Sequence, residues 1–176
     1  MEVTVIRSPR RRKSAQARLV DGVLVVRIPA RSSKAEEARL VAQFRRRFAR
    51  EAAADGVDLT VRAARLARRH GLPKPTEIRW VSNQAHRWGS CTPDTGVVRL
   101  SDRMAGFPTW VIDHVIVHEL AHLVEHGHGP AFQELASRYP LAERAEGFLI
   151  AKAGSCDPTD DPMTNDIDTD PDAIPL

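Results

Sequence analysis

The sequence contains no long apolar run and very few cysteines. Its N-terminal segment, MEVTVIRSPRRRKSAQ, has no stretch of signal-peptide length, and runs such as VLVV are far too short to span a bilayer. Cys91 and Cys156 are the only cysteines among 176 residues, and their spacing supplies neither a disulfide framework nor a cysteine zinc site. These absences predict a chain that resides in the reducing cytoplasm and makes no contact with membranes.

Basic residues are absent from the last part of the chain. All 26 Lys and Arg lie at or before Lys152, whereas seven of the 23 acids follow it. Residues 154–176 are rich in Asp and Pro and poor in apolar side chains, so we expect a disordered acidic tail there. Residues 1–79 hold 20 basic and 8 acidic side chains, and residues 80–153 hold 6 and 8. A nucleic acid would therefore bind the first half, although such charges usually cover solvated helix faces.

Periodicity predicts one domain of helices and strands over residues 1–153, since 42% hydrophobic residues supply one ordinary core. Residues 3–8 and 17–29 are rich in β-branched side chains around an Asp21-Gly22 turn, which favours antiparallel strands. Two basic helices follow over residues 32–54 and 58–70. Further strands are expected over residues 76–82 and in a hairpin over residues 87–104 that turns at PDTG.

The last part of the domain has the pattern of three helices. A long apolar helix begins at Pro108 and Thr109 and is stopped by Gly127. A second helix opens at Pro130, and a third follows Pro140. The expected fold class is therefore α+β, with a small antiparallel or mixed sheet packed against the long helix and further helices.

Four of the seven histidines fall within eleven positions, in the segment VIVHELAHLVEHGHGPAF. Three pairs stand four residues apart, counting His114, and this spacing places two imidazoles on one helical face about 6 Å apart along the axis. Only His118 and His122 have a carboxylate, Glu119, after the first histidine, as in the H-E-x-x-H pattern of zinc hydrolases. The other two pairs could bind a metal but would have no built-in base.

The same spacing selects a third ligand. His126 would stand about 12 Å from His118 along a straight helix, whereas ligands of one zinc lie within about 4 Å of one another. Gly127 can take the left-handed conformation that ends a helix, and His128 could then return over the ion. We predict that His118, His122 and His128 bind one Zn2+ ion.

The predicted ligand set indicates hydrolysis. Three imidazoles leave the fourth position of zinc open to water, the ion lowers the pKa of water to about 7, and Glu119 can accept the proton. Glu119 can then pass this proton to the leaving amine of a peptide bond. A lone H-E-x-x-H also arises by chance, and a histidine on an apolar helix is more often a core residue. The apolar back face of Ile112, Ile116 and Leu120, together with His128, favours the metal site.

The chain resembles the YgjP-like zinc metallopeptidases, which are related to the WLM and SprT groups. The resemblance depends on RRRK at residues 10–13, RWGSC at residues 87–91 and DHVIVHELAHLVEHGHGPAF at residues 113–132, in this order. It implies a minimal zincin fold, zinc held by the same three histidines, and Glu119 as the base. Relatives in the wider group include proteases that act on DNA-bound proteins. Gly127 and Gly129 depart from the Asn and Ser that commonly flank the third histidine in this family.

Five further residues are candidates for supporting roles. Arg87 and Trp88 would lie on a strand where an extended substrate could pair, although a core position is the alternative for the tryptophan. Asp113 and His126 could orient ligand imidazoles, and Tyr139 could donate to an oxyanion. Packing or simple exposure is the alternative for each of these three residues.

These patterns support two hypotheses about function. The first is a cytoplasmic zinc metallopeptidase that acts on proteins or peptides. The second is a non-catalytic, zinc-containing binding module of the same fold, whose basic half docks on nucleic acid or an acidic partner. The presence of Glu119 beside three histidines favours the enzyme.

Overall fold

Residues 1–153 are described by a computed structural model, in which the chain divides into two units between Ala52 and Ala53. The predicted acidic tail lies outside the described residues. The division does not coincide with the charge boundary predicted at residue 79. One domain over residues 1–153 stays a prediction, because a spatial division alone does not say whether the units fold together.

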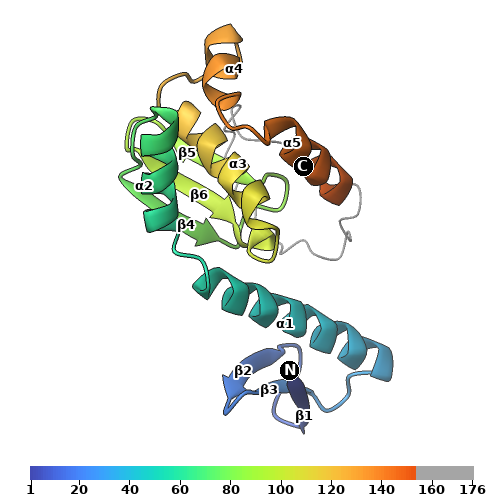
Figure 1. Cartoon of the computed structure of the whole chain (residues 1–176). Coiled ribbons are helices and arrows are strands. Elements are labelled where there is room, and N and C mark those ends of the chain that lie inside the picture. The colour runs from blue at the N-terminus through green and yellow to red at the C-terminus, as the bar shows by residue number, and fades with distance from the viewer. Residues whose placement is uncertain (154–176) are drawn as a thin grey trace. The chain divides into compact units, whose positions relative to one another are not determined.

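The first unit contains a mixed sheet with the strand order β1-β3-β2 (Figure 1). Its strands are β1 (Glu2–Ser8), β2 (Gln16–Val20) and β3 (Val23–Pro29). β2 and β3 form the predicted hairpin, in which Asp21 and Gly22 have φ angles of 48° and 80°. β1 is parallel to β3, so the prediction of antiparallel strands is wrong for β1. The connection over residues 9–15 crosses the end of β3, which leaves β3 in the centre of the sheet.

The core of the first unit lies between this sheet and α1 (Lys34–Asp55). Leu24, Val26 and Ile28 alternate along β3 and are completely buried. Phe44 and Phe48 of α1 pack against them, because their i, i+4 spacing keeps both rings on one helical face. Ser33 caps the start of this helix, since its Oγ accepts a hydrogen bond of 3.1 Å from Glu36 N.

The second unit has a sheet of the order β4-β6-β5, with β4 parallel and β5 antiparallel to β6. Its elements are β4 (Glu77–Val81), β5 (Gly89–Thr92), β6 (Val97–Ser101), a short 3-10 helix (Asp102–Met104), α2 (Leu59–His70), α3 (Thr109–Ala121), α4 (Pro130–Ala136) and α5 (Ala142–Ala153). α2 and α3 lie on one face of the sheet (Figure 1). β5 is an edge strand, and α3 packs against it. The mixed α+β class expected from the sequence is confirmed.

α3 is buried around most of its circumference. Val115, Ile116 and Leu120 are completely buried in one core with Val98 and Leu100 of β6. α2 and α5 also pack on α3. None of the helices between residues 1 and 153 combines the length and apolar character needed to cross a bilayer. The apolar residues of α3 are accounted for by their burial in the core of this unit.

α3 ends earlier than the sequence predicted. His122 is its C-cap, and residues 122–126, which were expected to be helical, are not: residues 122–124 form a turn, and the chain is irregular at residues 125 and 126. The amides of Leu123 and Val124 donate to carbonyls three residues back, at 3.2 and 3.0 Å, so the backbone tightens after Ala121. Gly127 does not have a positive φ angle, and the predicted left-handed stop at Gly127 is wrong.

We predict that the two units unfold together. The first unit is small, with three completely buried apolar residues, and α1 runs continuously across the boundary. Leu24→Ala in the first unit and Leu100→Ala in the second should each lower the free energy of unfolding by about 2–5 kcal/mol. Urea denaturation followed by circular dichroism should show one transition for both variants. Two transitions, each sensitive to only one substitution, would contradict the prediction.

Candidate metal centre

Three histidine side chains converge where α3 ends. His118 lies in the last turn of α3, His122 is the C-cap, and His128 lies in the loop before α4. The Nε2 atom of His118 is 3.2 Å from that of His122 and 3.4 Å from that of His128. Among residues 1–153, these three side chains form the group of His, Cys, Asp and Glu that could hold a metal ion. The turn that begins at His122 therefore brings His128 back toward His118, which was the effect predicted for Gly127.

The separation of the three nitrogens fits zinc. Zinc–nitrogen bonds of about 2.0–2.1 Å at tetrahedral angles place neighbouring ligand nitrogens roughly 3.3–3.4 Å apart. The two measured Nε2 distances lie close to this value. All three donors are imidazoles, which suit zinc better than calcium or magnesium. The donor set is thus chemically and geometrically suited to one zinc ion.

The turn after α3 orients His122. Its Nδ1 atom lies 3.0 Å from the backbone carbonyl oxygen of Glu125. Because a carbonyl can only accept, Nδ1 carries the proton and Nε2 presents its lone pair to the other histidines. The sequence did not reveal this partner, since a backbone carbonyl has no residue-specific signal.

Phe132 of α4 packs beneath all three imidazoles. Its ring is 1% exposed and stacks on His122 with a centroid distance of 4.3 Å. It also meets the rings of His118 and His128 edge-on, at 4.8 and 4.7 Å. Phe132 therefore restricts each ring without competing for its nitrogen lone pair. Spacing in the sequence does not indicate this role, because it arises from tertiary contacts between α4 and the histidines.

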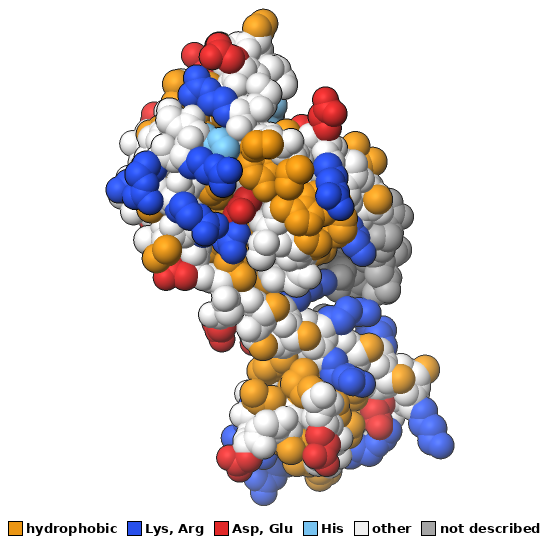
Figure 2. Space-filling model, viewed as in Figure 1, with side chains coloured by type: hydrophobic (Ala, Val, Ile, Leu, Met, Phe, Trp, Pro, Cys, Tyr) orange, Lys and Arg blue, Asp and Glu red, His pale blue; other side chains and the backbone are white. Residues whose placement is uncertain are grey.

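Burial favours the neutral form of His118. Its pKa lies well below the ordinary value, first because of burial and then because His122, His114 and His128 are close. A neutral imidazole is the form that binds zinc. His128 is exposed, and Figure 2 shows histidine side chains at the surface of this unit. The site thus joins buried nitrogens to one that solvent reaches.

The side chain of Glu119 does not join the three histidines but lies against strand β5. It is completely buried on α3 and lies against Gly89, the first residue of β5. The helix therefore presents His118 to the histidine cluster and Glu119 to the edge strand. These adjacent residues bring a carboxylate and a metal-binding group together on one rigid element.

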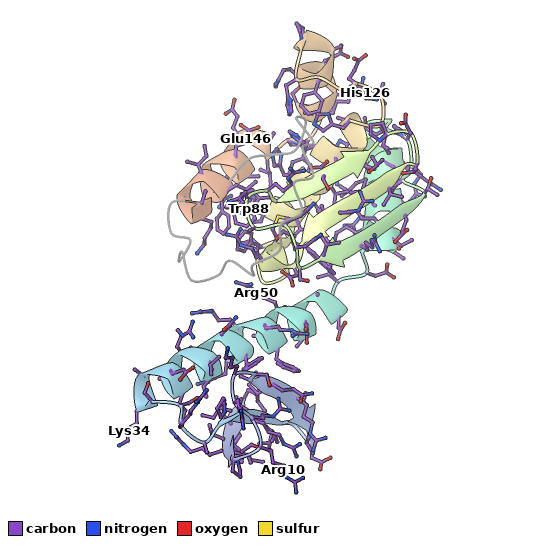
Figure 3. The ribbon with its side chains drawn as sticks, turned by 180° about the vertical axis from the view of Figure 1, so that it is seen from behind. Arg10, Lys34, Arg50, Trp88, His126 and Glu146 are labelled. Carbon is purple, nitrogen blue, oxygen red and sulfur yellow. The ribbon has the colours of Figure 1, made fainter. Side chains whose placement is uncertain are left out.

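Three of the five supporting candidates, Trp88, Arg87 and His126, differ in how far they are buried. Trp88, which is labelled in Figure 3, is buried. Its ring lies 5.3 Å from that of Phe107, and the guanidinium of Arg103 lies over it. This is the core position considered as its alternative. Arg87 is half-buried in an isolated bridge just before β5. His126 is exposed in the loop after α3 (Figure 3).

Asp113 and Tyr139 have partners in the helical layer. Asp113 Oδ1 lies 2.6 Å from a guanidinium nitrogen of Arg62, which joins α3 to α2. The hydroxyl of Tyr139 donates to the carbonyl oxygen of Trp110 at 2.9 Å. Both interactions hold α3 in place, which differs from the imidazole-orienting and oxyanion roles considered for these residues.

Comparison with known protein families identifies a match that covers most of the chain. The model of the YgjP-like metallopeptidase domain matches residues 10–147 and therefore spans both structural units. No curated protein and no solved structure matches the chain. The matched region includes all three histidines and Glu119.

We predict that His128, and not His126, contributes to zinc affinity. The free energy of zinc binding at sites of four ligands is about 10–16 kcal/mol. One ligand therefore contributes roughly 3 kcal/mol, which corresponds to about 100-fold in zinc affinity. His128→Ala should cause a loss of this order in chelator competition, and the exposed neighbour variant His126→Ala should bind zinc as the wild type does. Equal zinc affinity in the wild type and His128→Ala would remove His128 from the site.

A second prediction concerns acid stability. Burial lowers the pKa of His114 to about 4 from 6.5, and Glu146, 4.0 Å away and mostly exposed (Figure 3), does not offset this. The unfolded chain therefore binds a proton first as the pH falls below 6.5, and the folded state loses stability. At pH 5 the loss is about 2 kcal/mol.

The variant His114→Leu lacks this proton-binding group. Between pH 8 and pH 5, its free energy of unfolding should fall by about 2 kcal/mol less than that of the wild type. Urea denaturation of both proteins with a chelator present measures this difference, because metal release then contributes to neither. An identical pH dependence of the two proteins would contradict the assignment.

Proposed function

Because the chain belongs to the YgjP-like metallopeptidase family, we propose that it hydrolyses peptide bonds with zinc at the three-histidine centre and with Glu119 as general base. The observation that carries this proposal is the convergence of three imidazole nitrogens at the spacing of zinc ligands. Three protein ligands are typical of catalytic zinc, whereas closed structural sites use four.

The chain's own residues have distinct tasks in this proposal. His118, His122 and His128 hold the ion, Glu125 orients His122 through its carbonyl, and Phe132 restricts the rings. When bound, zinc supplies a Lewis acid for the substrate carbonyl and lowers the pKa of water. The histidines stay neutral ligands throughout.

Glu119 moves the proton. Its carboxylate accepts a proton from the attacking water and returns it to the leaving amine, so no group on the substrate has to leave as an unstable anion. Glu119 directly follows His118 on the buried helix α3, so the helix fixes both side chains. β5 lies beside it and is the edge of its sheet, which supports pairing of an extended peptide along this strand.

The basic first unit favours a second candidate function. Residues 1–52 contain 14 Lys and Arg and 5 Asp and Glu. Arg10, Arg12 and Lys13 are exposed in the loop between β1 and β2. This distribution supports docking on nucleic acid or an acidic partner, either alone or to bring substrates to the enzyme. If Glu119→Gln protein lost its peptidase activity but still performed its role in the cell, docking alone would be favoured.

The proposed mechanism predicts the effect of Glu119→Gln. The amide cannot accept the proton, so hydrolysis of fluorescently labelled casein should fall by at least about 100-fold. The zinc content should stay at the wild-type level, because Glu119 is not a ligand. Glu143→Gln is the matched control, since Glu143 has an exposed side chain in the first turn of α5 and has no part in the proposed mechanism.

Chelation of the metal should stop casein hydrolysis by the wild type, and added zinc should restore it. Undiminished proteolysis by Glu119→Gln protein that still holds zinc would overturn the mechanism.

A further inference from the structure

Gly89 leaves space that Glu119 occupies. A Cβ atom placed on Gly89 would lie 2.5 Å from Oε1 of Glu119 and 3.0 Å from its Cδ. It would also lie 2.9 Å from Cγ1 of Val115. Ordinary contacts between such atoms are about 3.5–4.0 Å. No side chain fits at residue 89 while Glu119 stays where it is.

The backbone conformation does not require glycine at this position. The glycines with positive φ angles among residues 1–153 are Gly22, Gly71 and Gly96. Gly89 has a strand conformation that any residue can adopt. The space taken by Glu119 and Val115 is therefore the reason for glycine here.

The backbone around Gly89 is held on both sides. The carbonyl of Trp88 accepts a hydrogen bond of 2.9 Å from Ser101 N, and the Trp88 ring is buried. On the other side, Ser90 Oγ accepts a hydrogen bond of 2.7 Å from the buried amide of Gln84. Gly89 itself pairs with Leu100 of β6. A side chain added at residue 89 would consequently displace Glu119, whose carboxylate ends a flexible chain, more easily than the strand.

We propose that Gly89 is a positioning residue for Glu119. The bare backbone of β5 forms a wall against which the Glu119 carboxylate rests, and this contact fixes where the base can take up a proton. The inference depends on the proposed role of Glu119 as general base. It assigns to the glycine of the RWGSC segment a task that its own chemistry does not reveal.

The variant Gly89→Ala tests this assignment. A displacement of about 1 Å in a reacting group can cost on the order of 100-fold in rate. With labelled casein, kcat should fall by roughly this factor, while KM stays within about threefold and zinc content equals that of the wild type. Gly106→Ala is the matched control, because a Cβ there meets nothing within 4 Å. Wild-type kcat in zinc-loaded Gly89→Ala protein would overturn the proposal.

Combined variants separate a positioning role from general damage. If Gly89 acts through Glu119, adding Gly89→Ala to Glu119→Gln should lower the residual rate by less than about threefold. A further 100-fold loss would mean that Gly89 acts independently of Glu119 and would overturn the inference. Activity retained in Glu119→Gln alone would instead disprove the proposed function, so the two failures are distinguishable.

A second background guards against misfolding of Gly89→Ala. Val115→Ala removes Cγ1 of Val115, and Glu119 stays the nearest neighbour of a Cβ at residue 89. Gly89→Ala in this background, compared with Val115→Ala alone, should show the same loss of kcat with unchanged zinc content. Equal kcat in the two folded proteins would overturn the inference.

Discussion

The burial of α3 against the second sheet is the constraint on which the candidate site depends. Val115, Ile116 and Leu120 are buried against the sheet, and this packing fixes the rotation of the helix about its axis. Once that rotation is fixed, His118 can face only the loop before α4, and Glu119 can face only β5. The hydrophobic contacts thus determine the direction of the polar groups. The salt bridge of Asp113 and the hydrogen bond of Tyr139 hold the same helix from its other sides.

The loop after α3 and helix α4 complete the histidine cluster that begins at the end of α3. The helix ends at Ala121, the turn after it reverses the chain so that His128 lies near His118, and the ring of Phe132 packs against the imidazoles. Each step uses nonpolar or backbone interactions, so the imidazole nitrogens remain available to an ion. The geometry of the site is therefore set largely by atoms that are not themselves metal ligands.

Much of this arrangement followed from spacing in the sequence. The four-residue interval of His118 and His122 and the exclusion of His126 by distance led to the three histidines that converge in the structure. The reason offered for the return of His128 was nevertheless wrong, because tightened turns, and not a left-handed Gly127, reverse the chain. Gly89 and the carbonyl of Glu125 were beyond sequence reasoning, since their roles arise only from tertiary contacts. The parallel pairing of β1 was missed because side-chain alternation does not encode strand direction.

The ligands differ in how firmly the fold holds them. His122 is buried and tied to a carbonyl, and His118 belongs to a helix packed in the core, whereas His128 is exposed on a loop. Local opening of that loop costs less than opening of α3. A metal ion would then be exchanged stepwise, and the two fixed imidazoles would be the first to capture it and the last to release it. The rate at which the protein gains or loses its metal would be governed by the loop, while the affinity reflects all three nitrogens.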